Sequence, residues 1–226
     1  MKLSVLIPLF NEEKTIGQIL EKLLRQKIIS EVIIVDDGST DDSATIVKKF
    51  VKKSKKIKLF QKENAGKGSA IRLALQKATG DYVLIQDADL EYDPEDIPVL
   101  VEPVLKGRAA VIYGSRFIGA HSNLLFWHRI GNILLNFLIN LLYNTTLSDM
   151  ETCYKLLPTK LMKSLQLTAD KFDLEPEITC KILKKGIRIY EVPINYMGRD
   201  FNEGKKTTWK DGFGALRMIL ALKLLV

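Results

Sequence analysis

The sequence predicts an α/β protein with a mostly parallel sheet that helices cover on both faces. Short apolar runs of strand length alternate with segments of helical periodicity through the first half of the chain. This alternation is typical of parallel strands joined by helices, which are buried on both faces. Acid-rich segments follow the first, second and fourth apolar runs. Ligands of such sheets bind outside the carboxyl ends of the strands, so we expect these segments to form one site.

The elements of the first half follow from apolar spacing and turn signals. The expected strands cover residues 3–7, 32–35, 57–60, 82–86 and 109–113. The expected helices cover residues 12–25, 68–78 and 96–106, and another helix, capped by Ser39 to Asp41, ends near Lys53. Asn64 to Ser69 resembles a phosphate loop only faintly, because its glycine spacing fails, and we interpret it as a glycine-rich helix start.

The pattern changes after Tyr113. Residues 124–143 are apolar nearly all round but carry Asn132, Asn136 and Asn140, whose spacing of four places them on one helix face. Such a helix either lies in a membrane interface or packs against the domain with the asparagines outward. Further along we expect a helix at 172–183, a strand at 187–192, a mobile polar loop at 198–209 and an apolar, basic helix at 209–226.

Composition limits the class of protein. The 226 residues suit one domain, and a formal net charge of +7 could serve nucleic acid, anionic lipid or phosphorylated substrates. The basic residues are not interleaved with aromatic side chains, so we expect no nucleic-acid binding. Cys153 and Cys180 lie far apart without metal-ligand spacing, which fits a reducing, cytoplasmic setting. No signal peptide begins the chain, and no stretch reaches the roughly 20 apolar residues of a membrane span.

The motif Asp87-Ala88-Asp89-Leu90-Glu91 directly follows an expected buried strand. Its clustered carboxylates repel each other and raise each other's pKa unless a cation neutralises them. Carboxylates suit Mg²⁺ or Mn²⁺, and Mg²⁺ is usually held by one or two carboxylates together with substrate phosphates. The motif therefore indicates a metal–diphosphate site. The alternative is an acidic turn that caps the next helix, for which Asp93-Pro94-Glu95 already supplies a start signal.

Three motifs occur together in one order: Ile7-Pro8-Leu9-Phe10-Asn11-Glu12, Val35-Asp36-Asp37-Gly38-Ser39-Thr40-Asp41 and Asp87-Ala88-Asp89. In these motifs the chain resembles the inverting family 2 glycosyltransferases, which have the Rossmann-like GT-A fold. Within that family it is similar to dolichol-phosphate mannose synthases and other polyprenyl-phosphate glycosyltransferases. Further matches are Gly114-Ser115-Arg116-Phe117, Asp149 to Lys155, Glu191-Val192-Pro193 and Arg199 to Lys206.

The resemblance implies a donor site. Its residues would be Pro8, Phe10, Glu12, Asp36, Asp37, Asp87 and Ala88. The first three would line the nucleotide pocket, one Asp of the pair would bond the base or ribose, and Asp87 would contact the donor. Asp89 and Glu91 would hold Mg²⁺ or Mn²⁺, although relatives often carry Gln in place of Glu91.

The resemblance also implies four phosphate-binding cations. They are Arg199 and Lys205, which would clamp the donor diphosphate from a closing loop, and Arg116 and Arg129, which would receive the acceptor phosphate. We expect Asp89, Arg116, Arg199 and Lys205 to act in catalysis. In one domain of residues 1–226, residues 1–118 would bind the nucleotide sugar, and residues 119–226 would bind the acceptor and the membrane interface.

The expected reaction is metal-dependent, inverting transfer of mannose or glucose from GDP-mannose or UDP-glucose to a polyprenyl or dolichyl phosphate. A phosphate acceptor is already ionised at neutral pH, so the reaction needs no strong general base. The enzyme would be peripheral on the cytoplasmic face of a membrane, anchored by interfacial amphipathic helices, a partner protein or a removed tail. Two rivals remain: the same fold acting on a polysaccharide or soluble acceptor, and a non-catalytic, membrane-associated binder of nucleotide sugars. The absence of a G-x-G-x-x-G segment after the first strand argues against a dinucleotide oxidoreductase.

Overall fold

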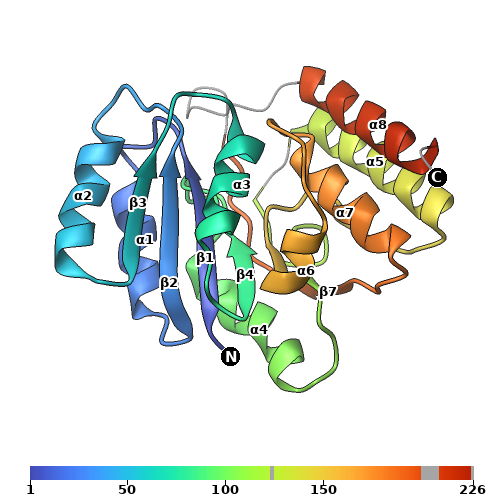
Figure 1. Ribbon diagram of the computed structural model, residues 1–226. Coiled ribbons are helices and arrows are strands. Elements are labelled where there is room, and N and C mark those ends of the chain that lie inside the picture. The colour runs from blue at the N-terminus through green and yellow to red at the C-terminus, as the bar shows by residue number, and fades with distance from the viewer. Residues whose placement is uncertain (123–124, 200–208, 225–226) are drawn as a thin grey trace.

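The computed structural model describes residues 1–122, 125–199 and 209–224, and the side chains of residues 209–211 are not described. Within these residues, seven strands form one sheet in the order β3-β2-β1-β4-β6-β5-β7 (Figure 1). The strands are β1 (Leu3–Leu9), β2 (Ile29–Asp36), β3 (Ile57–Gln61), β4 (Tyr82–Ile85), β5 (Ile112–Ser115), β6 (Lys155–Pro158) and β7 (Tyr190–Pro193). Strand β6 is antiparallel to both β4 and β5, and the remaining pairs are parallel.

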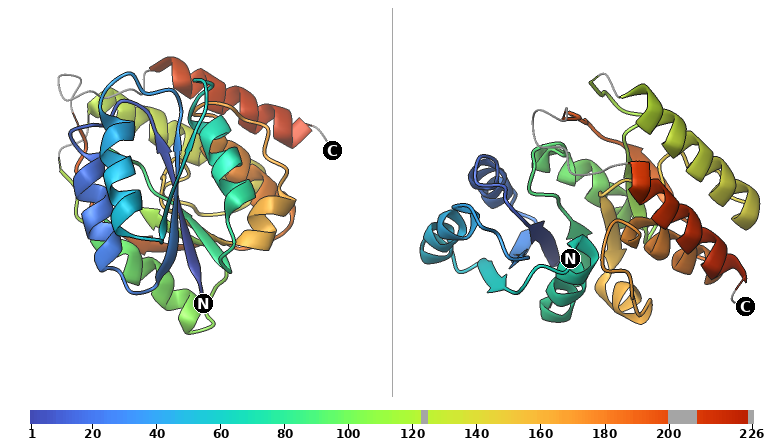
Figure 2. Two further views of the ribbon diagram at one scale, coloured as in Figure 1. Left: turned by 60° about the vertical axis from the view of Figure 1, so that its left-hand side comes forward. Right: turned by 90° about the horizontal axis from the view of Figure 1, so that it is seen from above.

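The helices cover both faces of this sheet. They are α1 (Ile16–Arg25), α2 (Ser43–Lys53), α3 (Lys67–Lys77), α4 (Ile97–Leu105), α5 (Phe126–Tyr143), α6 (Thr159–Ser164), α7 (Leu174–Lys184) and α8 (Trp209–Leu224), with a short 3₁₀ turn at Pro94–Asp96. Figure 2 shows α1 and α4 on one face and α3 and α6 on the other. Helices α5 and α8 lie side by side, away from the first strands of the sheet, and α7 contacts both (Figure 1).

The core lies where the central strands meet these helices. Strand β1 is buried along almost its whole length, as parallel strands covered on both faces are. One carboxylate, Glu31, is buried in this region between Ser4, Lys58 and Thr79, whose groups donate hydrogen bonds of 2.6–2.8 Å to it. Burial alone would raise the pKa of Glu31, but these hydrogen bonds outweigh burial and lower its pKa to about 2.

The predicted fold class is confirmed, and four details differ. The first four strands lie where the apolar runs placed them, whereas β5 begins three residues later and β7 runs from residue 190 to 193. Strand β6 and helix α6 were not predicted, because β6 has only four residues, begins at Lys155 and ends at Pro158. No helix in the described ranges is long and apolar enough to cross a membrane.

Candidate active site

A cavity of about 870 Å³ opens at the carboxyl ends of β1, β2 and β4. Pro8, Phe10 and Glu12 after β1, Asp37 after β2, and Asp87, Ala88, Asp89 and Glu91 after β4 all line it. The expectation that the polar segments after these strands meet at one edge is therefore met in the structure. The remaining wall comes from the segment at the start of α3, from the segments after β5 and before β6, from α5, α8 and residues near α7, and from Tyr196 and Arg199.

The two aspartates after β2 hold the loops around the cavity. Asp37 lines it and accepts hydrogen bonds from the backbone nitrogens of Ala65, at 3.0 Å, and Gly66, at 2.7 Å. Asp36 is buried and is not among the lining residues; it accepts from Ser39 N and from Gln61 Nε2, both at 3.0 Å. Of the pair, only Asp37 is therefore placed to approach a nucleotide directly. The predicted helix start at Asn64 to Ser69 is the segment that Asp37 holds, and it also contributes to the cavity wall.

The guanidinium group of Arg199 lies against two carboxylates of the acidic motif and against Glu12. Arg199 Nη2 lies 2.8 Å from Asp89 Oδ2, and its Nη1 lies 3.1 Å from Glu12 Oε2. The Arg199 backbone nitrogen also donates to Glu91 Oε1 at 2.8 Å. Arg199 thus supplies a cation for Asp89 and Glu91, and Lys67 supplies one for Asp87.

One backbone angle and one pKa in this motif depart from ordinary values. Leu90 has φ of 63°, a left-handed conformation that costs a residue with a branched side chain about 1–2 kcal/mol. Burial and the neighbouring Asp87 and Glu91 raise the pKa of Asp89 to about 7, against the opposing effect of Arg199. The separate residue Asp93 caps the following turn by accepting from Glu95 N. The acidic motif therefore faces the cavity, and the residue that caps the following 3₁₀ turn is Asp93.

Arg116, directly after β5, also lines this cavity. Its Nε and Nη2 donate to the two oxygens of Asp149, both at 2.7 Å, and Asp149 is fully buried. Burial opposes its charge, but Asp149 outweighs burial and raises the pKa of Arg116. Arg129 also lines the cavity, and both guanidiniums lie over the Phe117 ring, at 5.5 Å and 5.3 Å. The two arginines expected at the acceptor phosphate are therefore brought together.

Comparison with known proteins now identifies the family. The profile of glycosyl transferase family 2 matches residues 4–165. The chain belongs to this family. A relative from Methanococcus voltae, named UDP-N-acetylglucosamine–dolichyl-phosphate N-acetylglucosaminyltransferase, is 27% identical over 97% of this chain and 95% of its own length. The dodecaprenyl-phosphate galacturonate synthase of Rhizobium johnstonii is 25% identical over 91% of this chain and 62% of its own length.

Solved structures share the fold of this family 2 glycosyltransferase. Glucosyl-3-phosphoglycerate synthase from Mycobacterium tuberculosis, crystallised with Mn²⁺, UDP and phosphoglyceric acid, superposes with a TM-score of 0.78 at 20% identity. The match covers 100% of this chain and 79% of that one. At this identity the likeness confirms the GT-A fold.

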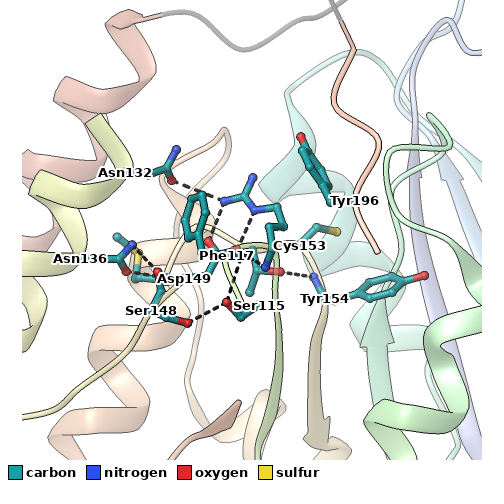
Figure 3. Close-up of polar contacts among 12 residues, drawn as sticks. Ser115, Phe117, Asn132, Asn136, Ser148, Asp149, Cys153, Tyr154 and Tyr196 are labelled. Carbon is teal, nitrogen blue, oxygen red and sulfur yellow. Dashed lines mark hydrogen bonds and ion pairs between the residues drawn. The ribbon is translucent and has the colours of Figure 1, made fainter. Parts of the chain in front are cut away.

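The asparagine stripe of the glycosyltransferase turns inward, so the interpretation that placed it outward is wrong. Asn136 Nδ2 donates to Ser148 O at 3.0 Å, and Met150 N donates to Asn136 Oδ1 at 2.7 Å (Figure 3). Asn140 makes the same pair of bonds with the backbone of Leu147. The asparagine side chains thus make hydrogen bonds with the backbone of the loop that carries Asp149. Because this polar face of α5 points inward, much of the apolar surface of the helix is exposed.

Several cavity residues escaped the sequence analysis. Lys67 bridges Asp87 and Glu175, at 2.9 Å and 2.8 Å, and Glu151 lies in the same wall. Glu151 occurred inside a motif quoted for the resemblance, and Lys67 lay in the glycine-rich segment that we interpreted only as a helix start. Glu175 carried no local signal, because it meets Lys67 only through the fold. Lys205 and most of the expected mobile loop lie outside the described residues.

Proposed function

We propose that this glycosyltransferase moves a neutral hexose from a nucleoside-diphosphate sugar to a polyprenyl phosphate, with inversion. The observation that carries the proposal is one cavity with two kinds of charge. Acidic Asp89 and Glu91 follow the end of β4, whereas the cations Arg116 and Arg129 follow β5 and lie on α5, respectively. The first group suits a metal-bound diphosphate and the second suits a phosphate acceptor.

The donor would bind at the acidic end. Among the described residues, no group of three or more carboxylate, cysteine or histidine side chains is arranged to hold a metal ion. Two carboxylates around a cation nevertheless fit Mg²⁺ or Mn²⁺ completed by diphosphate oxygens, and the related fold crystallised with Mn²⁺ and UDP supports this. The metal would supply Lewis-acid stabilisation of the leaving diphosphate. Arg199, once released from the carboxylates, would neutralise the same developing charge.

The acceptor would bind between Arg116 and Arg129. An oxygen of the ionised acceptor phosphate attacks the anomeric carbon from the face opposite the diphosphate. The new bond joins that oxygen to the carbon, and the bond from the carbon to the diphosphate oxygen breaks with its electron pair. No proton has to be removed from the acceptor. The names of the two polyprenyl-phosphate and dolichyl-phosphate relatives support this class of acceptor.

We also propose that α5 and α8 rest on a membrane surface, on its cytoplasmic face. The large apolar side chains exposed on these helices are Phe126, Trp127, Ile133, Leu134, Phe137, Leu141, Phe213, Leu220 and Leu224. Trp127 is 78% exposed, and its helix borders the cavity. An apolar face beside an acceptor site suits a substrate whose hydrocarbon tail stays in lipid. Residues 119–226 would then form the acceptor and membrane half, and residues 1–118 the donor half.

The test is a transfer assay with defined substrates. The protein is incubated with Mg²⁺, a short polyprenyl phosphate and, in separate reactions, UDP-glucose, GDP-mannose or UDP-N-acetylglucosamine. Mass spectrometry should detect one polyprenyl-phosphate sugar, and its stereochemistry should be inverted. A parallel reaction with 3-phosphoglycerate examines a soluble phosphate acceptor. Transfer to 3-phosphoglycerate alone, or binding without any transfer, would replace the proposed acceptor or remove the catalytic assignment.

A further inference from the structure

Two carboxylates in the cavity wall have no part in the binding of metal, diphosphate or acceptor described above. Glu151 follows the loop that carries Asp149, and Glu175 lies in the first turn of α7. Both line the cavity, and Lys67 joins Glu175 to Asp87 of the acidic motif. Glu151 interacts electrostatically with Glu175, so we expect the pair to lie beside the acidic end, where the sugar joined to a bound diphosphate would lie.

Each of these carboxylates has one buried oxygen without a partner in the described part of the chain. The atoms are Glu151 Oε1 and Glu175 Oε2. Glu175 is only 3% exposed, and Lys67 engages its other oxygen, Oε1. A buried acceptor that makes no hydrogen bond costs about 1–3 kcal/mol, so its retention calls for an explanation. The cavity beside it offers one, since a ligand hydroxyl could donate to each oxygen.

Charged residues from three other elements surround this pair. Lys67, at the start of α3, is already shared by Asp87 and Glu175. Lys155 on β6 donates to Met150 O at 2.7 Å and lies 4.4 Å from the Tyr113 ring, and its charge acts on both glutamates without an ion pair among the described contacts. After β5, Arg116 is paired with Asp149. These three cations already have partners, whereas Glu151 Oε1 and Glu175 Oε2 have none among the described residues.

We propose that Glu151 and Glu175 accept hydrogen bonds from hydroxyl groups of the donor hexose, and that they select neutral hexoses against uronic acids. A hexose presents several hydroxyl donors, and two carboxylate oxygens can each take one. A uronic acid would bring a further carboxylate towards Asp87 and Glu175, which already share the one ammonium group of Lys67. The Rhizobium relative is named for galacturonate, so selection of this kind would separate members of one family. The inference rests on the proposed function for the identity of the donor.

The experiment measures donor binding without any acceptor. Isothermal titration in Mg²⁺ gives Kd for UDP, UDP-glucose and UDP-glucuronate, and the same series is run with GDP, GDP-mannose and GDP-mannuronate. In the series whose neutral sugar binds more tightly, we expect the neutral donor to bind at least tenfold more tightly than its uronate. Glu175→Gln should weaken neutral-donor binding about tenfold or more, the loss expected for a hydrogen bond to a charged group. Glu151→Gln should weaken it less, because burial and the neighbouring Glu175 raise the pKa of Glu151 to about 8 and leave this carboxyl group largely protonated at neutral pH. The same variants should leave Kd for the free nucleoside diphosphate within about twofold. They should also reduce the difference in Kd between the neutral donor and its uronate.

Controls keep the outcomes separate. Glu102→Gln removes an exposed carboxylate that pairs only with Lys106 on the surface of α4, and it should change none of these constants. Glu151→Gln breaks no described ion pair, so it remains informative if loss of the Lys67–Glu175 pair unfolds the other variant. Equal weakening of diphosphate and sugar donor, unchanged donor binding, or equal affinity of wild type for hexose and uronate would each overturn the inference. The inference would also be overturned if neither UDP-glucose nor GDP-mannose bound more tightly than its free nucleoside diphosphate. A protein that binds donors as expected but transfers nothing to polyprenyl phosphate would disprove the proposed function and leave the sugar subsite standing.

Discussion

Replacement of Arg199 by alanine should change metal binding and diphosphate binding in opposite directions. The guanidinium group of Arg199 occupies the space between Asp89, Glu12 and Glu91. A divalent cation that binds Asp89 must first break the 2.8 Å bond from Arg199 Nη2. A diphosphate that binds next to that cation gains Arg199 as a partner. The same side chain therefore competes with the metal alone and cooperates with the metal–nucleotide complex.

The structure sets the size of both effects. A hydrogen bond to a charged group contributes about 1.5–3 kcal/mol, and the Arg199 side chain is 16% exposed, so we take the lower end. Arg199→Ala should then strengthen binding of Mn²⁺ alone about tenfold and weaken binding of UDP or GDP at saturating Mn²⁺ about tenfold. In EDTA the variant should also be less stable to urea, because Asp89 loses its counter-ion.

Isothermal titration with Mn²⁺, followed by the nucleoside diphosphate, measures both constants in one preparation. Lys22→Ala is the matched control, since it removes a cation that pairs with Asp93 at 2.7 Å just beyond the acidic motif. It should change neither constant. Weaker binding of Mn²⁺ alone in Arg199→Ala would refute the competition, and unchanged diphosphate binding would refute the clamp.

Three further predictions concern the acceptor, the membrane and the core. Arg129→Ala should raise the apparent KM for polyprenyl phosphate about tenfold and leave donor Kd unchanged. Arg116→Ala should have the same effect and should also destabilise the protein, because Asp149 would stay buried and unpaired. If Arg129→Ala affected only donor binding, the acceptor site would lie elsewhere. The double variant Phe137→Ser and Leu134→Ser should co-sediment less with anionic liposomes than the wild type, whereas Val51→Ser on α2 should co-sediment equally. Equal co-sedimentation of all variants would contradict the proposal that α5 rests on the membrane. Glu31→Gln should lower the free energy of unfolding by up to about 3 kcal/mol at pH 7. Because the folded pKa of Glu31 lies near 2 and its ordinary value is 4.5, the wild type should lose this advantage as pH falls from 4.5 towards 2; a pH-independent difference in urea denaturation would contradict the assignment.

The sequence predicted those parts of the fold that rest on local pattern. The apolar runs at 3–7 and 82–86 are continuous and end in acidic turns, so both the strands and the site edge could be read from them. Strand β6 could not, because its four residues begin with a lysine whose ammonium group is satisfied only by carbonyls of the preceding loop. The outcome for Asn136 shows the same limit, since spacing revealed the shared face but its partners lie 12 and 14 residues away.

Glu175 illustrates the limit for the site. Nothing around it in the chain marks a ligand group, and its partner Lys67 is more than a hundred residues earlier. The carboxylates of the acidic motif were found because they stand at every second position, 87, 89 and 91, directly after an apolar run. Side chains that converge from α3, α7 and the loop before β6 leave no such pattern, and only the fold brings them into one wall.

The hydrogen bonds from the asparagine side chains of α5 to residues 147–150 hold both this loop and the arginine that it binds. Asn136 brackets Asp149 by bonding the backbone of the residues on either side of it, and Asp149 in turn grips Arg116. The helix that displays Phe137 to the outside and the guanidinium inside the cavity therefore belong to one stiff unit. On a bilayer, that unit would hold the phosphate receiver at a constant height above the hydrocarbon. Reactivity would then depend on how far a lipid phosphate rises from its leaflet, so acceptors would be distinguished by the depth of their headgroups.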